Sequence, residues 1–309
     1  MRSHRLLFSG AILAIGLCLA GSGWLLWAAE VDPYDQSGVP LEKQPTDPSK
    51  AKIVLVAGRQ SHGPGDHEFF AGCAILMKML QQTSGVAPVM ARDGWPKKAD
   101  TFEGAKAVVF YMDGGGGHPI LQKEHREVVQ KLMDKGVGFV NLHYAVEYPK
   151  SQGDHVLQWL GGYYETNYST NPHWVAEIKS LPKHPITRGV KPFTIRDEWY
   201  FNIRFKPELD GGTPILKATP PDNVRGTEAA RKHEGRSEIL AWAFDRANGA
   251  RSFGFTGGHT HKNWGEENFR RLVVNAILWS AKVDVPKDGT KVEMDPDELK
   301  RNLDDKRKR

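Results

Sequence analysis

The chain has 309 residues, of which 39% are hydrophobic and 26% are charged, a composition typical of a globular protein rather than a disordered one. The formal net charge is +5, and part of this excess lies at the two ends of the chain, for example in the closing run 306–309. No basic stripe with interleaved aromatic residues occurs between the ends, which argues against nucleic-acid binding.

Residues 1–30 are predicted to be a signal peptide or an N-terminal membrane anchor. A basic start precedes residues 6–29, which contain no charged side chain and are long enough to span a bilayer as a helix. Ala20 and Ser22 supply the small residues that cleavage requires, whereas tryptophans near the end of the run favour an uncleaved anchor. Both alternatives predict an exported protein, either secreted or held at the membrane in a periplasmic or other extracytoplasmic compartment.

The remaining chain divides into three predicted regions. Residues 31–50 are rich in Pro, Asp, Gln and Ser, which is typical of a flexible linker. Residues 51–283 form the predicted folded domain, and Cys73 is its single cysteine, so no internal disulfide is expected. Residues 284–309 are charged and poor in apolar side chains, which predicts a solvated tail.

Short apolar runs alternate with amphipathic segments along this domain. Strands are predicted at residues 52–58, 86–91, 105–111, 137–142, 239–244 and 251–255. Helices are predicted at residues 67–82, 122–135 and 268–282. The alternation predicts an α/β fold with an open, mostly parallel sheet and helices on both faces.

Six of the twelve histidines lie in segments just past the end of a predicted strand. They are His62 and His67 after the first strand, His118 after the third, His143 after the fourth, and His259 and His261 after the last. Ligands of open parallel sheets bind beyond the carboxyl ends of the strands. The sequence therefore predicts a histidine-rich pocket at one edge of the sheet.

At these loops the sequence resembles the trehalose-utilisation (ThuA-like) family. The matching segments are residues 61–69, 113–118, 138–145, 160–163, 197–200 and 257–259. The resemblance implies a class I glutamine amidotransferase-like, flavodoxin-like fold over residues 51–283. It also implies a role in disaccharide or glycoside use through oxidised (3-keto) sugars, and hence a small sugar as the partner.

The resemblance also places His143 where amidotransferases carry their cysteine nucleophile, at a sharp strand-to-helix turn. Cys73 lies inside a predicted helix and cannot serve that turn, so glutaminase activity is excluded. An imidazole at this position can act as a general base or a metal ligand. The alternative is that His143 only caps the following helix.

Three residues are candidates for proton transfer: His143, His118 and Glu68. Glu68 opens the first predicted helix, where a carboxylate is also favoured by the helix dipole alone, and Asp66 is the expected N-cap. The glycine run 114–117 can bring backbone N–H groups close to an oxyanion.

Candidate substrate-binding residues combine carboxylates, aromatic rings and histidines, a set that suits sugar hydroxyls and ring faces. They are Tyr144, Asp197, Glu198, Trp199, His259 and His261. The alternatives are core packing for the aromatic residues and simple loop positions for the two histidines.

A zinc-like divalent metal is the cofactor that the histidines suggest, with ligands drawn from five of them, of which His62 and His67 are singled out: His62, His67, His118, His143 and His259. Three functions therefore remain open: an enzyme (hydrolase, lyase or isomerase) acting on a sugar or keto-sugar, a metal-dependent hydrolase, and a non-catalytic carbohydrate-binding module.

Overall fold

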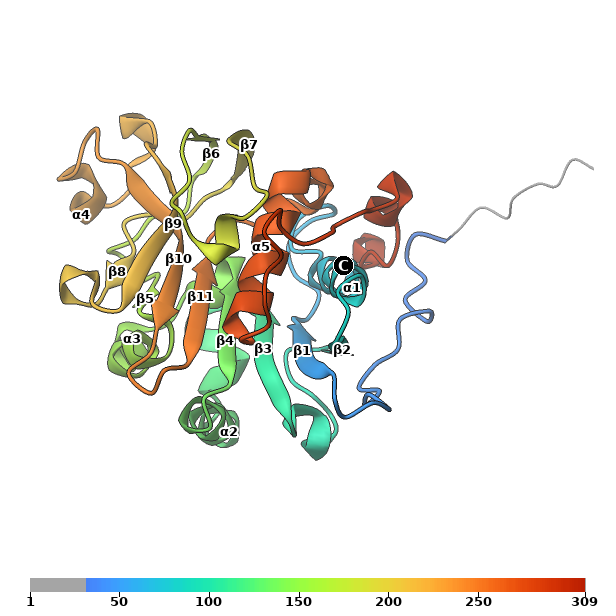
Figure 1. Ribbon diagram of the computed structural model, residues 1–309. Coiled ribbons are helices and arrows are strands. Elements are labelled where there is room, and N and C mark those ends of the chain that lie inside the picture. Colours follow the sequence, from blue (N-terminus) through green and yellow to red (C-terminus); the bar gives the residue numbers. More distant parts are fainter. Residues whose placement is uncertain (1–31, 309) are drawn as a thin grey trace, which may run out of the picture. The chain divides into compact units, whose positions relative to one another are not determined.

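The computed structural model describes residues 32–308 (Figure 1). The predicted signal peptide or membrane anchor, residues 1–30, lies outside the described residues. Within 32–308, no helix combines the length and the apolar character that crossing a membrane requires.

A seven-stranded sheet forms the centre of the fold, in the order β2-β1-β3-β4-β11-β10-β9. The strands from β2 to β11 in this order run parallel, and β10 is antiparallel to both of its neighbours. The bounds are β1 Ala51–Ala57, β2 Val86–Ala91, β3 Ala105–Tyr111, β4 Gly138–Leu142, β9 Gly212–Ala218, β10 Glu238–Asp245 and β11 Arg251–Phe255. The predicted α/β fold with an open, mostly parallel sheet is confirmed.

Helices cover both faces of this sheet (Figure 1). One face packs against α1 (Phe69–Gln81) and α5 (Glu267–Ser280), the other against α2 (Lys123–Asp134) and α3 (Gly153–Leu160). Along β1, Leu55 belongs to the first core and its neighbours Val54 and Val56 to the second, because successive strand side chains point to opposite faces. Double burial explains why these strands are continuous apolar runs.

The less regular part of the chain between β4 and β10 contributes two small antiparallel pairs and, between β9 and β10, one short helix. β5 (Gly162–Tyr163) pairs with β8 (Arg204–Phe205), and β6 (His173–Ile178) pairs with β7 (Phe193–Glu198), while α4 spans Glu228–Arg231. The β6–β7 pair matters for the site because β7 ends at Glu198.

The segment predicted as a flexible linker, residues 31–50, is docked on the domain where it is described. Leu41 forms a parallel bridge with Met90 at the free edge of β2. Glu42 is 6% exposed and accepts hydrogen bonds from two backbone N–H groups at 2.9 and 2.7 Å. The linker prediction is wrong here because an apolar and an acidic side chain both find partners on the domain.

The prediction of a solvated tail for residues 284–309 is also wrong for the described part. Val285 and Val292 are buried in the core that α1 and α5 share. The side chain of Lys306 is only 1% exposed, because an ion pair with Glu68 compensates its charge. Charge alone therefore did not keep this segment in solvent.

Candidate metal centre

Three of the predicted loop histidines and one glutamate meet at the carboxyl edge of the sheet. His67 precedes α1, His143 follows β4, His259 lies beyond β11, and Glu198 is the last residue of β7. One nitrogen or carboxylate oxygen of each lies within 4.8 Å of the corresponding atom of every other. We call His67, His143, Glu198 and His259 the HHEH cluster.

The contacts within the HHEH cluster are short. Nε2 of His67 lies 3.0 Å from Nε2 of His143 and 2.9 Å from Nδ1 of His259. Oε2 of Glu198 lies 2.9 Å from Nδ1 of His259 and 3.4 Å from Nε2 of His143. Ligands of one tetrahedral ion with bonds of about 2.0–2.1 Å are separated by about 3.3 Å, so these spacings match a shared coordination sphere.

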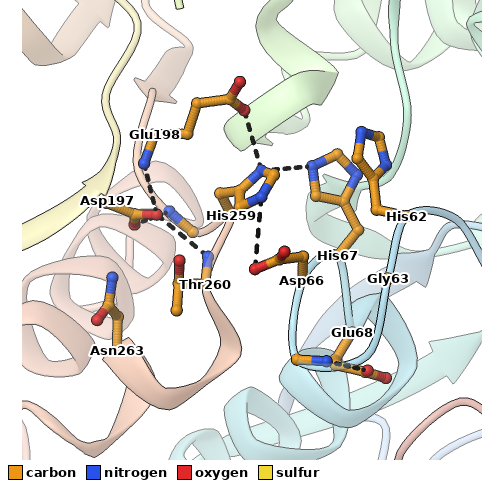
Figure 2. Close-up of polar contacts among 12 residues, drawn as sticks. His62, Gly63, Asp66, His67, Glu68, Asp197, Glu198, His259, Thr260 and Asn263 are labelled. Atoms are coloured by element: carbon orange, nitrogen blue, oxygen red, sulfur yellow. Dashed lines mark hydrogen bonds and ion pairs between the residues drawn. The ribbon is translucent and has the colours of Figure 1, made fainter. Parts of the chain in front are cut away.

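The second nitrogen of each ring faces an acceptor, which assigns the tautomers from the hydrogen-bond network. Nδ1 of His67 donates to Asp113 Oδ1 at 2.9 Å, and Nδ1 of His143 donates to the Thr256 carbonyl at 2.9 Å. Nε2 of His259 faces Asp66 Oδ1 at 3.4 Å (Figure 2). Partners of this kind orient metal-binding imidazoles and fix their tautomer.

These tautomers leave the inner nitrogens of the cluster without hydrogens. The Nε2 atoms of His67 and His143 then face each other at 3.0 Å as two lone pairs, which is repulsive unless a cation lies between them. Three imidazoles and one carboxylate form a ligand set that suits a zinc-like divalent ion. His62, predicted as a ligand, lies outside the HHEH cluster and forms a second group with His67 and Asp113, whose Oδ1 accepts from Nδ1 of His67.

The electrostatics of the cluster agree with an arrangement for binding a cation. Burial, reinforced by the neighbouring histidines, holds the pKa of His67 far below its ordinary value, so this ring does not supply a proton to the contact with His143. Burial would raise the pKa of Glu198, but the adjacent His143 and His259 lower it strongly, since either ring, when protonated, donates to the carboxylate and carries a positive charge. Burial opposes protonation of His259 as well, yet Glu198 raises its pKa.

Backbone conformation also singles out the cluster. His67 and His143 adopt positive φ angles of 48° and 56°, and His62 shares this conformation at 56°. Left-handed backbone is uncommon for residues other than glycine and concentrates at functional sites. The chain turns sharply at His143, as predicted, but Leu142 holds the N-cap position of the following short helix, and Nδ1 of His143 bonds to the Thr256 carbonyl instead of capping it.

Asp197, predicted to bind substrate, instead positions the loop that carries His259. Its carboxylate is fully buried and accepts backbone hydrogen bonds from Gly258 at 2.7 Å and Thr260 at 3.1 Å (Figure 2). Because this carboxylate is fully buried and bonded to the loop backbone, a sugar hydroxyl does not reach it.

The structure places Glu68 and His118 outside the HHEH cluster. Glu68 is 1% exposed, pairs with Lys306, and points away from the histidines (Figure 2). The residue that precedes α1 is Glu68 rather than the predicted Asp66, and its side chain makes no capping hydrogen bond. His118 is buried against Tyr148, donates to the Ala145 carbonyl at 3.1 Å, and has a pKa lowered by burial to about 4. Neither position suits the predicted proton transfer.

Two further predicted substrate contacts are buried elsewhere. Trp199 is fully buried and packs against Phe255 and Phe269, so the core alternative holds for it. His261 is 4% exposed, and burial lowers its pKa to about 4 beside the charges of Glu68 and Lys306. Tyr144 is only partly buried, with its ring 5.9 Å from that of His67, and remains at the border of the cluster.

Sequence reasoning missed the assignment of Glu198 as a cluster member and the carboxylates that orient the rings, Asp66 and Asp113. The position of Asp113 directly after the third strand was an available signal. Glu147 was missed entirely. Its Oε1 and the hydroxyl of Tyr144 lie 3.3 and 3.6 Å from the point where a Cβ at Gly115 would be, so both groups flank the glycine run.

Comparisons with known proteins agree with the resemblance seen in the sequence. The family model ThuA, described as trehalose utilisation, matches residues 54–280. A ThuA-like protein from Bacteroides uniformis is 18% identical, with a TM-score of 0.55 over 82% of this chain and 98% of that chain. One from Parabacteroides merdae is 17% identical, with a TM-score of 0.55 over 81% and 99%. A glutamine amido transferase from Methylobacillus flagellatus is a more distant match, at 15% identity and a TM-score of 0.34 over 83% and 87%. No curated protein matches the sequence.

Proposed function

The chain belongs to the ThuA (trehalose utilisation) family, and from this premise we propose that it is a metal-dependent enzyme that acts on a sugar or keto-sugar. The HHEH cluster is the proposed site of the ion. The carrying observation is the 3.0 Å contact between Nε2 of His67 and Nε2 of His143, with Nδ1 of each ring facing an acceptor, which assigns a lone pair to each Nε2. A divalent ion in this position would act as a Lewis acid toward a sugar carbonyl or hydroxyl oxygen.

Residues at the border of the cluster supply the other groups that sugar chemistry needs. Glu147 accepts a hydrogen bond from Thr166 at 3.1 Å, and burial raises its pKa, with the negative charge of Glu198 acting in the same direction. We propose that Glu147 takes over the proton-transfer role first assigned to Glu68 and His118. Tyr144, whose ring lies 5.9 Å from that of His67 and whose hydroxyl lies near Gly115 together with Glu147, offers a ring face and a hydroxyl to the sugar.

We expect protein purified without an affinity tag or chelator to contain about one divalent ion per chain. At an ion concentration of about 1,000 times Kd, binding adds about 4 kcal/mol to the free energy of unfolding. Each kcal/mol shifts Tm by about 2–4 °C in a domain of roughly this size, so chelation should lower Tm by on the order of 10 °C. Elemental analysis and thermal unfolding measure both effects. The proposal would be refuted if the protein purified without metal and its Tm did not change on addition of zinc, manganese, cobalt or iron.

The substrate class is tested separately with the metal-loaded protein. Glycosides and their 3-keto derivatives are incubated with the enzyme, and products are identified by mass spectrometry. Turnover of the oxidised sugars that stops on chelation supports the proposal, whereas binding without any product would leave a carbohydrate-binding protein in its place.

We further propose that the protein is exported, on the basis of the uncharged run at residues 6–29. A fusion of residues 1–50 to a reporter enzyme that is active only outside the cytoplasm should be active. A matched fusion with two arginines inserted in the middle of the run should lose that activity. Equal activity of the two fusions, or a stable but inactive parent fusion, would contradict export.

A further inference from the structure

The loop between β1 and α1 carries the ligand His67 and the carboxylate of Asp66, which faces His259. Two of its residues, His62 and His67, have left-handed backbone. A loop in this conformation keeps its geometry only when surrounding contacts hold it there. What holds it therefore determines where the His67 ring lies.

The C-terminal segment makes these contacts through one side chain. Nζ of Lys306 donates to the carbonyl of Gly63 at 3.1 Å and to the carbonyl of Asp66, and it pairs with Glu68 Oε1 at 3.1 Å. The Lys306 and Glu68 side chains are 1% and 2% exposed. One buried ammonium thus connects the residues on both sides of the loop's turn.

Glu68 completes the connection from the loop side. Its Oε1 accepts a hydrogen bond from the Gly65 N–H at 3.0 Å, and its Oε2 accepts one from the Asp304 N–H at 2.8 Å (Figure 2 shows the first). The carboxylate is therefore bonded to the loop and to the tail at once. These bonds explain why Glu68 is buried and does not take part in proton transfer.

The tail is itself held by the segment at the start of the described chain. The Leu303 N–H donates to the Pro33 carbonyl at 2.8 Å, and the Gln36 side chain donates to Asp304 Oδ1 at 3.1 Å. Two segments distant in sequence therefore support the loop that presents His67: the tail contacts it directly, and residues 33–36 hold the tail.

A buried ion pair contributes little to net stability, because desolvation offsets the attraction of the two charges, and its best-supported use is to specify one geometry. We propose that Lys306 is a positioning residue for the metal centre: by bonding to Glu68 and to the carbonyls of Gly63 and Asp66, it fixes the loop so that His67 points its Nε2 at the ion. This inference rests on the proposed metal-dependent function.

The test compares zinc affinity in full-length wild type, Lys306→Met and the double variant Glu68→Gln/Lys306→Met, by competition with a chromophoric chelator well below each Tm. Loss of an outer partner of a metal ligand typically weakens binding about 10–100-fold. We expect this loss in both variants, together with an altered visible spectrum of the cobalt-substituted protein.

The double variant separates positioning from charge compensation. It leaves no buried charge unpaired, so its Tm should return toward that of wild type while its zinc affinity stays low. If the single variant fails to fold, the double variant alone still tests whether Lys306 positions the metal site. Lys300→Met is the matched control, because Lys300 pairs with Asp297 on the same tail at 2.8 Å but is 78% exposed, and it should bind zinc like wild type.

Zinc affinity and a cobalt spectrum equal to wild type in the double variant would overturn the positioning role. If wild type itself binds no ion, the proposed metal-dependent function is wrong, and the positioning role of Lys306 is wrong as well. The two failures are distinguished by the wild-type measurement alone.

Discussion

The His67→Ala variant is expected to purify without a bound ion and to unfold at the temperature of chelator-treated wild type. His67 has the central position in the HHEH cluster, because its Nε2 contacts nitrogens of both His143 and His259. Removing a direct ligand should weaken binding by more than the 10–100-fold that is typical of outer partners. Elemental analysis and thermal unfolding with and without added zinc measure the loss.

The control is His155→Ala, which removes an exposed histidine of α3 and should leave metal content and the zinc-dependent rise in Tm unchanged. Stoichiometric metal in His67→Ala would show that the ion, if present, is bound elsewhere. A variant that lacks metal but retains full turnover would instead separate the ion from the reaction.

The sheet was predictable because its signal is local. Strands buried on both faces must be short apolar runs, and β1, β3 and β4 are such runs. Parallel strands also place their carboxyl ends at one edge, so the sequence order predicted that the six loop histidines would gather there, and three of them, His67, His143 and His259, do meet. Convergence followed from topology and needed no knowledge of side-chain packing.

The individual roles were not predictable in the same way, since they depend on side-chain direction. Asp197 and Glu198 are adjacent on β7, and successive strand residues point to opposite sides. One carboxylate therefore reaches the backbone of the His259 loop and the other reaches the cluster. The two residue types are chemically equivalent in the sequence, and only their alternate positions along β7 determine which carboxylate faces the cluster.

Glu68 failed as a candidate for a different reason. Its neighbour His67 has φ +48°, which turns the chain so that the two side chains diverge. Glu68 pairs with Lys306, which is more than 200 residues away in the sequence. Lys306 belongs to the charged segment that was predicted to be exposed to solvent. A long-range ion pair of this kind leaves no periodic signal in the sequence.

The Glu147→Gln variant should lose about 10²–10⁴-fold in turnover of the sugar identified by the substrate screen, because a positioned proton donor contributes on that scale. Gln keeps the size of the side chain and the acceptor for Thr166 but cannot transfer a proton. Metal content and Tm should stay close to wild type, since Glu147 is not a member of the HHEH cluster. Glu127→Gln, on the exposed surface of α2, is the matched control and should retain full turnover.

The pH profile gives a second, independent readout of this role. Burial raises the pKa of Glu147 above its ordinary value of 4.5, and the charge of Glu198 adds to the shift. A raised pKa keeps the carboxyl protonated to higher pH, so a general acid loses activity as pH rises through that pKa. We expect wild type to show this alkaline limb and Glu147→Gln to lack it. Turnover above about a tenth of wild type with the limb unchanged would assign the proton transfer to another group, and Tyr144 would be the next residue to replace.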